Sequence, residues 1–243
     1  MSRVLSKTIK LAKIISTPAL RVALRRHHVA AGVEHQQILH DLACYTVVDI
    51  GANRGQFALV ARHCFPHAQI FSFEPLHKPA AIFHKVFTGD PNVELHQVAI
   101  GPEAGNATIH VSIRDDSSSL LPITALQNQI FPDTQESGIE TIKVGRLEDF
   151  ISAERLQPPA LLKLDVQGYE LSALKGCEVL LQHFAYVYVE CSFVELYAHQ
   201  ALADEVIAWL RERDFILCGV YNMAYDRVGK AVQADFLFKH LAG

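Results

Sequence analysis

Four acidic residues stand at the ends of short apolar runs that are typical of buried β-strands: Asp49, Glu74, Asp165 and Glu190. The carboxyl ends of parallel strands meet at one edge of an open α/β sheet, and ligands of such sheets bind there. Repeated carboxylates at that edge repel a phosphorylated ligand that lacks a metal, and they attract a cationic ligand. The acids therefore predict a binding site for a positively charged cofactor.

A glycine turn follows the first run, Thr46–Ile50, and leads into a helical apolar pattern at Gln56–Cys64. The spacing Asp49-x-Gly51-x-x-x-Gly55 differs from the dehydrogenase pattern G-x-G-x-x-G. The glycines let a ligand approach the backbone, and the start of the helix is expected to offer free N–H groups. Asp49 lies close to where a pyrophosphate would have to sit. S-adenosylmethionine carries an ammonium and a sulfonium but no phosphate, and it is the predicted cofactor.

A second acid, Glu74, lies 19 residues beyond Gly55 and follows the run Gln69–Phe73. An acid in that position is placed to accept hydrogen bonds from both ribose hydroxyls of a nucleoside. The alternative is a generic βαβ unit in which Glu74 is a surface residue.

The pattern along the chain predicts an α/β fold: a Rossmann-like, doubly wound, seven-stranded and mostly parallel sheet with the last strand antiparallel, plus an inserted hairpin and an N-terminal helical extension. The predicted strands of the main sheet are Thr46–Ile50, Gln69–Phe73, Val93–Val98, Ala160–Asp165, Ala185–Glu190, Phe215–Gly219 and Ala234–Lys239. The inserted hairpin is predicted at Asn106–Ile113 and Ile139–Val144, and a helix is predicted at Leu147–Glu154.

A long irregular stretch, Arg114–Ser137, separates the two hairpin strands. Such stretches inside a compact domain are usually lids or binding loops. The hydroxyls of Ser117–Leu120 are expected to face the cofactor or the acceptor, the alternative being a mobile linker. The polar segment Tyr221–Lys230 is predicted to be a loop.

The first part of the chain is basic and amphipathic. Met1–His28 predicts one or two helices broken near Pro18, and Val33–Leu42 predicts another helix. Residues 1–42 are therefore interpreted as a helical extension of a domain at 43–243. A basic amphipathic helix can lie on an anionic membrane, so residues 1–28 are a candidate for peripheral membrane contact. The alternative is a helix that packs on the core.

The charge distribution argues against nucleic acid as a partner. Seven basic residues and no acidic one precede Glu34, and the whole chain carries −4, so the remainder carries −11. An acidic body of this kind is not typical of nucleic-acid binding.

The composition predicts a cytoplasmic protein of one large domain, or one domain with an extension. Half of the 243 residues are hydrophobic, but no uncharged apolar run is long enough to span a membrane. Met1–Ile15 mixes basic with apolar residues, unlike a signal peptide. The five cysteines are dispersed and lack C-x-x-C spacing, so neither disulfides nor a metal site is expected. The oligomeric state is not encoded in any pattern.

Five stretches carry a family resemblance: Val48–Gly55 (VDIGANRG), Phe73–Pro75 (FEP), Gln97–Gly101 (QVAIG), Ser117–Leu120 (SSSL) and Leu162–Glu170 (LKLDVQGYE), the last followed by Leu174–Gly176. Together they resemble the FkbM family of class I S-adenosylmethionine-dependent methyltransferases. The resemblance runs from about Thr46 to the end of the chain. Gln167 departs from the family pattern, in which an acid is common, and is not expected to carry the chemistry.

The resemblance implies transfer of a methyl group to a hydroxyl oxygen, often of a sugar, a glycolipid or a secondary metabolite. It implies that the methionine end of the cofactor lies against the first motif, the ribose against the second, and the adenine between residues of the third. The cofactor-binding residues carried over in this way are Asp49, Gly51, Ala52, Asn53, Gly55, Glu74, Pro75, Val98 and Ala99, with Ser118, Ser119 and Asp165 as further candidates.

The protein must align the acceptor oxygen with the methyl group and help to remove its proton. Asp165 is the first candidate, as base or as cofactor anchor, and Lys163 lies two residues earlier on the same strand face. Glu190 is a further catalytic candidate, and Glu170 is a weaker one because an acid at a helix start is favoured by the helix dipole. The sequence does not single out the base.

Two other functions remain open at this point. One is a dinucleotide-dependent oxidoreductase on a similar sheet, and the other is a non-catalytic cofactor-binding protein. Binding of NAD(H) without binding of S-adenosylhomocysteine would favour the first of these.

Overall fold

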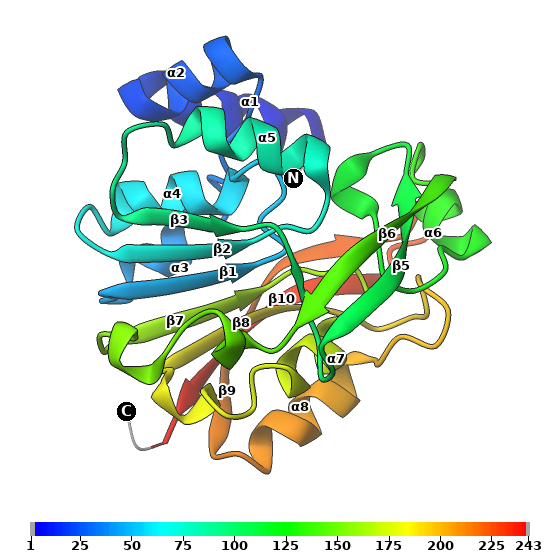
Figure 1. Ribbon diagram of the computed structural model, residues 1–243. Helices are drawn as coiled ribbons and strands as arrows, with labels where there is room; N and C mark the ends of the chain where they lie inside the picture. Colours follow the sequence, from blue (N-terminus) through cyan, green and yellow to red (C-terminus); the bar gives the residue numbers. More distant parts are fainter. Residues whose placement is uncertain (1–2, 242–243) are drawn as a thin grey trace.

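The computed structural model describes the backbone of residues 3–241 and the side chains from Thr8 to Leu241 (Figure 1). Within these residues a seven-stranded sheet has the order β3-β2-β1-β7-β8-β10-β9. The first five strands are parallel, and β10 pairs antiparallel with both of its neighbours. The strands are β1 (Thr46–Ile50), β2 (Gln69–Phe73), β3 (Val93–His96), β7 (Ala160–Leu164), β8 (Tyr186–Ser192), β9 (Phe215–Tyr225) and β10 (Ala231–His240). The predicted fold class is confirmed.

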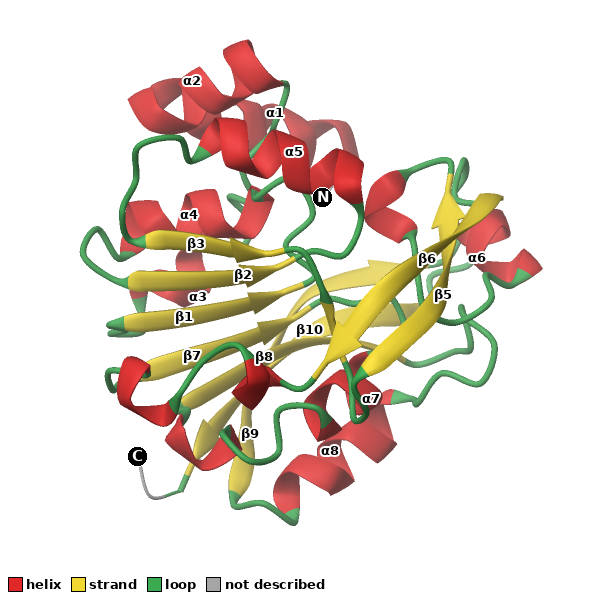
Figure 2. Cartoon of the chain, viewed as in Figure 1, coloured by secondary structure: helices red, strands yellow, loops and turns green. Residues whose placement is uncertain are grey.

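Helices cover both faces of this sheet (Figure 2). One face carries α3 (Gln36–His40), α4 (Gln56–Cys64) and α5 (His77–Val86), and the other carries α7 (Glu170–Lys175) and α8 (Ala203–Arg211). Side chains alternate along each strand, so Val47 packs under α4 whereas its neighbour Val48 packs on the α7–α8 side. The central strands are buried on both faces, which explains their nearly continuous apolar sequence.

The N-terminal helices α1 (Arg3–Ser16) and α2 (Pro18–His27) pack beside α4 and α5 rather than extending from the body (Figure 1). Ile14, Leu20 and Ala23 are buried in one cluster with Leu59 of α4. Pro18 occupies the first turn of α2, so the predicted break is confirmed. None of the described helices has both the length and the apolar character that a membrane crossing requires.

The helix predicted at Val33–Leu42 is shorter than expected, since α3 covers only Gln36–His40. The amide of Gly32 donates to the carbonyl of Gln56 at 2.9 Å and that of Val33 to Ala31 at 2.8 Å. These bonds hold the chain in a turn against the start of α4, so helical geometry begins only after His35.

The inserted segment forms a three-stranded sheet, of which sequence reasoning predicted only the hairpin. Its strands, in the order β4-β6-β5, are β4 (Ala99–Ile100), β5 (Gly105–Ser112) and β6 (Glu136–Gly145). The predicted strand Val93–Val98 is interrupted because the amide of Val98 turns back to the carbonyl of His96, which directs the chain into this second sheet. Between β5 and β6 lie a single 3₁₀ turn, η1 (Asp115–Ser117), and α6 (Ala125–Ile130), which Thr124 caps.

Two local predictions are wrong. The helix expected at Leu147–Glu154 is a pair of 3₁₀ turns, η2 (Leu147–Asp149) and η3 (Ala153–Arg155). The Asp149 carboxylate accepts a hydrogen bond from the amide of Arg146 and closes η2 after three residues. Outside these two predictions, a further 3₁₀ turn, η4, covers Leu181–His183. The first half of the expected loop Tyr221–Lys230 is strand, because β9 extends to Tyr225 and pairs with β10, and only the second half is a turn, closed by Asp226.

Candidate active site

A cavity of about 880 Å³ lies at the carboxyl ends of β1, β2 and β7. Its walls come from the turn after β1, the segment after β2, the start of β4, the stretch Arg114–Leu120, and the residues that follow β7. On one side the N-terminal segment completes the wall with side chains of α1, α2 and the turn before α3. The inserted sheet stands beside this edge of the main sheet (Figure 2). The volume of the cavity is of the size typical of ligand sites.

The glycine turn follows β1 in a conformation that only glycine suits. Gly51 has φ +84°, and a Cβ there would lie 1.9 Å from the carbonyl oxygen of Asp165. Gly55 has φ +91°, and its Cβ would lie 2.6 Å from the ring of Phe87. The two glycines therefore let β1, β7 and α5 approach closely beneath the cavity.

The backbone amides of this turn are all bonded within the protein. Gly51 and Ala52 both donate to the carbonyl of Phe73 at 3.0 Å, and Gly55 donates to Ala52 at 2.8 Å. Asn53 donates to Glu74 Oε2, and Arg54 to Gln56 Oε1, each at 2.9 Å. The amides from Gly51 to Gly55 are thus all used, whereas the free N–H groups expected at the start of α4 stay a prediction. A turn without free amides offers no cradle for a pyrophosphate, in contrast to phosphate-binding glycine loops.

Glu74 lines the cavity although only 5% of its surface is exposed. Its two carboxylate oxygens accept from the amides of Asn53 at 2.9 Å and Leu76 at 2.8 Å. These bonds fix the side chain and leave each oxygen able to accept a second donor. Burial raises the pKa of Glu74 to about 7.

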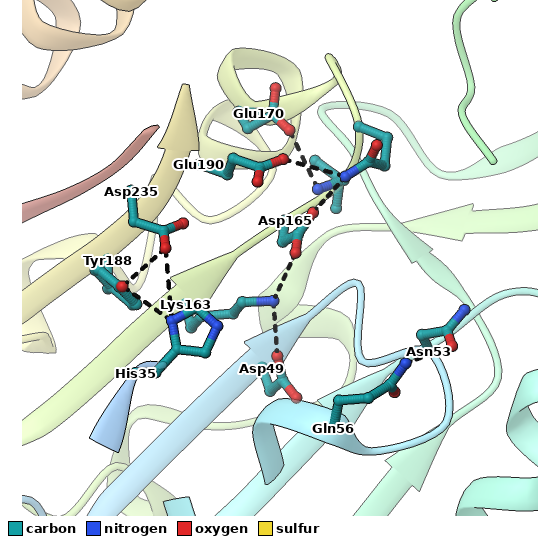
Figure 3. A network of polar contacts seen from close by, with 12 residues as sticks. His35, Asp49, Asn53, Gln56, Lys163, Asp165, Glu170, Tyr188, Glu190 and Asp235 are labelled. Atoms are coloured by element: carbon teal, nitrogen blue, oxygen red, sulfur yellow. Dashed lines mark hydrogen bonds and ion pairs between the residues drawn. The ribbon is translucent and has the colours of Figure 1, made fainter. Parts of the chain in front are cut away.

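Asp49 is fully buried and does not line the cavity, unlike the other predicted acids. It stands beside Lys163 in the parallel register of β1 and β7. The Lys163 ammonium lies 3.5 Å from Asp49 Oδ1 and 3.5 Å from Asp165 Oδ2, as Figure 3 shows. Burial raises the pKa of Asp49. Burial also opposes the charge on Lys163, but the carboxylates of Asp165 and Asp49 outweigh it and raise the pKa of this lysine.

Gln167, which sequence reasoning set aside, joins two of the predicted acids. Its side-chain amide donates to Asp165 Oδ1 at 2.7 Å and to Glu190 Oε2 at 3.1 Å, and its oxygen accepts from Tyr197 Oη at 2.7 Å. Burial, followed by the nearby charge of Asp165, raises the pKa of Glu190 well above its usual range. An amide at position 167 can donate to both carboxylates, which an ionised acid could not do.

Glu170 holds a turn of the backbone together at the start of α7. Its Oε1 accepts from the amides of Val166 and Gly168 at 3.2 and 3.0 Å and so holds the turn that leads into α7. Burial raises the pKa of Glu170 to about 7.

The serines of the predicted binding loop line the cavity, but their hydroxyls fasten the loop. Ser119 Oγ donates to the carbonyl of Gln167 at 2.6 Å, and Ser118 Oγ accepts from the amide of Ser112 at 3.1 Å. Arg54 forms an ion pair with Asp115 of the same loop. These contacts close the stretch after β5 over the glycine turn.

Most of the predicted site residues come together at the cavity wall: Gly51, Ala52, Asn53, Glu74, Pro75, Val98, Ala99, Ser118, Ser119, Lys163, Asp165 and Glu190. Asp49 and Gly55 lie behind it. Sequence reasoning missed His35, Arg54, Asp115 and Gln233, which also line the cavity. Among the described residues, no group of three or more His, Cys, Asp or Glu side chains is arranged to hold a metal ion.

The sequence profile of the methyltransferase FkbM domain matches residues 49–217 of this chain. The chain belongs to the FkbM methyltransferase family. The match covers the glycine turn, the inserted sheet, Asp165 after β7 and Glu190 within β8. It identifies this part of the chain as an S-adenosylmethionine-dependent methyltransferase domain.

Two similar proteins are named as methyltransferases, one of an oxygen position and one of a hexuronic acid. The 2-O-methyltransferase NoeI of Sinorhizobium fredii is 29% identical over 63% of this chain and 66% of its own length. The hexuronic acid methyltransferase AglP of Haloferax volcanii is 25% identical over 70% of this chain and 68% of its own length. The chain thus spans about two thirds of these relatives, and the activity, acceptor and partners of the whole protein are matters of proposal.

The fold is shared with a solved structure named "putative O-methyltransferase from Klebsiella pneumoniae". The TM-score is 0.54 at 12% identity, and the match covers 98% of this chain and 96% of that chain. This likeness concerns the fold alone.

The residues present fit the methyl donor of the family. The donor carries positive charge and no phosphate, and the cavity offers the carboxylates of Glu74 and Asp165 beside a turn without free amides. A glycine at position 51 leaves room where any Cβ would collide. The negative edge predicted from the sequence is therefore present, with Asp49 set beneath it rather than in it.

Proposed function

We propose that this protein transfers the methyl group of S-adenosylmethionine to a hydroxyl oxygen of a saccharide, free or carried on a lipid. The observation that carries the proposal is the single cavity that continues from the glycine turn and Glu74, past Lys163 and Asp165, to the N-terminal segment. Donor and acceptor need one shared, closed space because the acceptor oxygen must approach the methyl carbon in line.

The chemistry of the wall supports a saccharide acceptor. Beyond Lys163 the cavity is lined by groups that can bond to hydroxyls, namely Gln167, Glu190, Gln233 and His35. The name of one relative, a hexuronic acid methyltransferase, supports a saccharide, and the name of another, a 2-O-methyltransferase, supports transfer to oxygen. The amides of the glycine turn are already bonded within the protein, which disfavours a dinucleotide-dependent oxidoreductase. The family assignment favours methyl transfer over that function and over a non-catalytic protein.

The proposed roles follow the position of each residue on the wall. Gly51, Ala52, Asn53 and Asp165 hold the methionine end of the donor, with Asp49 acting through Lys163 and Gly55 through the shape of the turn. Glu74 and Pro75 hold the ribose, and Val98 and Ala99 flank the adenine. Ser118 and Ser119 keep the covering loop in place.

Replacing Glu74 with Gln tests the position of the ribose. The carboxylate would accept from two ribose hydroxyls, and hydrogen bonds to charged groups contribute about 1.5–3 kcal/mol each. E74Q should therefore weaken S-adenosylhomocysteine binding about 10- to 100-fold in calorimetry at pH 8. In the wild type, binding should weaken as the pH falls through about 7, because Glu74 then becomes protonated, and this dependence should be absent in E74Q.

The matched control is E103Q, which alters an exposed carboxylate away from the cavity wall. Equal affinity of E74Q and the wild type at pH 8 would show that the ribose lies elsewhere.

The reaction itself is tested with radiolabelled S-adenosylmethionine and a panel of methyl glycosides, free hexuronic acids and glycolipids. At least one saccharide should gain a methyl group that resists mild alkali, as an ether does and an ester does not. Transfer only to acceptors without a sugar, or only as an alkali-labile ester, would contradict the proposal.

Two glycines with nearly the same φ supply the controls for this assay. G51A should abolish transfer because its Cβ meets the backbone of Asp165, whereas G89A should retain it because nothing lies within 4 Å of its Cβ.

We further propose that the segment 1–42 is an extension of the domain at 43–243 and that α1 and α2 contact an anionic membrane. Partly exposed apolar side chains gather there: Ile9, Leu11, Ile15 and Val22 are 42–48% exposed. Exposed Arg25 and Arg26 lie on the same helices, whereas Lys10 is paired with Glu34 at 3.0 Å. Leu11 also lines the cavity, so a lipid-linked acceptor could enter from this side. Met1 and Ser2 lie outside the described residues, as do the side chains of Arg3, Val4, Leu5 and Lys7.

Sedimentation with vesicles tests this contact. The wild type should sediment with vesicles rich in phosphatidylglycerol but not with pure phosphatidylcholine, and R25Q/R26Q should lose most of this binding because basic residues near an anionic surface contribute about 1 kcal/mol each. K143Q/K175Q removes the same charge from exposed positions elsewhere and should bind as the wild type does. Equal sedimentation of both double variants would exclude the helices as the membrane contact.

A further inference from the structure

A buried polar cluster lies beside the cavity, and only one of its members, His35, has so far been given a place at the cavity wall. His35, from the turn before α3, has its Nδ1 atom 3.0 Å from Tyr188 Oη of β8 and 3.5 Å from Asp235 Oδ2 of β10. Tyr188 donates its hydroxyl hydrogen to the same Asp235 oxygen at 3.0 Å, and Asn222 of β9 donates to that oxygen at 2.7 Å. His35 and Asp235 lie outside the matched residues 49–217.

The hydrogen bonds of this cluster favour one tautomer of His35. A carboxylate is a stronger acceptor than a neutral imidazole, so Tyr188 gives its one hydroxyl hydrogen to Asp235, and its contact with Nδ1 then favours a hydrogen on Nδ1. Asn222 also lies 3.3 Å from Nδ1, but its amide has the nearer acceptor in Asp235. The neutral imidazole therefore has an Nδ1–H, and Nε2 keeps its lone pair.

Nε2 of His35 has no hydrogen-bond partner anywhere in the described part of the chain, and it is not among the atoms sealed from solvent. The ring lines the same cavity as Lys163, Asp165 and Glu190. The imidazole packs edge-on against the ring of Phe57, with 5.3 Å between the ring centroids. The Lys163 ammonium lies 5.3 Å from the centroid of the Phe57 ring. In Figure 3 the imidazole lies between the Tyr188–Asp235 pair and the Lys163 side chain.

We propose that His35 is the general base that removes the proton of the acceptor hydroxyl, and that Asp235 is the residue that positions it. This rests on the proposed methyl transfer. The acceptor oxygen forms a bond to the methyl carbon, the carbon–sulfur bond breaks with its electron pair remaining on sulfur, and the hydroxyl proton moves to Nε2. The resulting imidazolium is stabilised by Asp235 and then releases its proton to solvent. A histidine held by an acid in its basic tautomer is a recurrent solution for activating hydroxyls.

The groups around His35 favour this role. Burial lowers the pKa of His35, Asp235 and Glu34 oppose that effect, and Lys163 adds to it, so the ring is neutral near pH 7. The other cavity candidates are less suited. The carboxylates around Lys163 raise its pKa, burial raises the pKa of Glu190, which already accepts from Gln167, and Asp165 also accepts from Gln167 and contacts Lys163.

The first test needs no acceptor and no variant. In uniformly ¹⁵N-labelled wild-type protein, long-range ¹H–¹⁵N spectra at pH 7.5 should show His35 with a protonated Nδ1 and an unprotonated Nε2. The opposite tautomer, with the hydrogen on Nε2, would leave no lone pair on the ring nitrogen that has no protein partner and would overturn the proposal, whatever the outcome of the acceptor panel.

The second test uses the saccharide that turns over fastest in that panel. H35Q should lower kcat by about 100-fold or more, the range expected for loss of a general base, with KM and S-adenosylhomocysteine affinity within about threefold of the wild type. In the dependence of kcat on pH, the fall of kcat at low pH (the acidic limb) should be absent in H35Q. H67Q, at an exposed histidine, should leave both unchanged.

Asp235→Asn separates positioning from a merely structural role. The carboxylate raises the pKa of His35, so D235N should lower kcat and move the acidic limb to lower pH while the protein stays folded. An unmoved limb in D235N, or a full limb and near wild-type kcat in H35Q, would show that the cluster only supports the fold. A panel without any methylated saccharide contradicts the proposed function but leaves the tautomer result standing as a separate finding.

Discussion

The ammonium of Lys163 lies between the carboxylates of Asp49 and Asp165, in a position from which water is almost excluded. Asp49 is fully buried, and its Oδ2 atom has no hydrogen-bond partner in the described part of the chain. An unpaired carboxylate in such a place would cost several kcal/mol, so the lysine is what allows β1 to carry an acid through the centre of the sheet. The same ammonium holds Asp165 at the cavity wall. One buried cation thus connects the interior of the sheet to the edge where the methyl donor of the family binds.

Strand alternation extends this arrangement across the sheet. Asp49, Lys163, Tyr188 and Asp235 occupy neighbouring strands, and they point to the face that α3 and α4 cover. His35 approaches that face from the segment before β1, and Glu190, two residues after Tyr188, continues the row toward the cavity. The family domain therefore supplies the cation and the acids, whereas the flanking segments supply the imidazole and the carboxylate that orients it.

The sequence was informative where a local pattern is decisive. Apolar runs located β1, β2, β7 and β8, and the acids after them located the cavity, because alternation and strand ends depend on neighbouring residues only. It could not tell that Asp49 faces inward, which follows from strand register, or that His35 meets Asp235 across 200 positions of chain, which follows from the packing of the turn before α3 on the sheet. Three amides of the glycine turn are bonded to Phe73 and Glu74, at and just after the end of the next strand, which no spacing of glycines reveals. Once the order of the strands is known, the alternation of side chains along β7 and β8 places Lys163 and Tyr188 on the same face of the sheet.

Urea unfolding of the cofactor-free protein at pH 7.5 tests the central role of the buried lysine most directly. K163M should lower the free energy of unfolding by about 3–5 kcal/mol, because it strands the Asp49 charge, and D49N/K163M should regain most of that loss. If the double variant is no more stable than K163M, the ion pair between β1 and β7 is not the interaction on which this edge of the sheet depends.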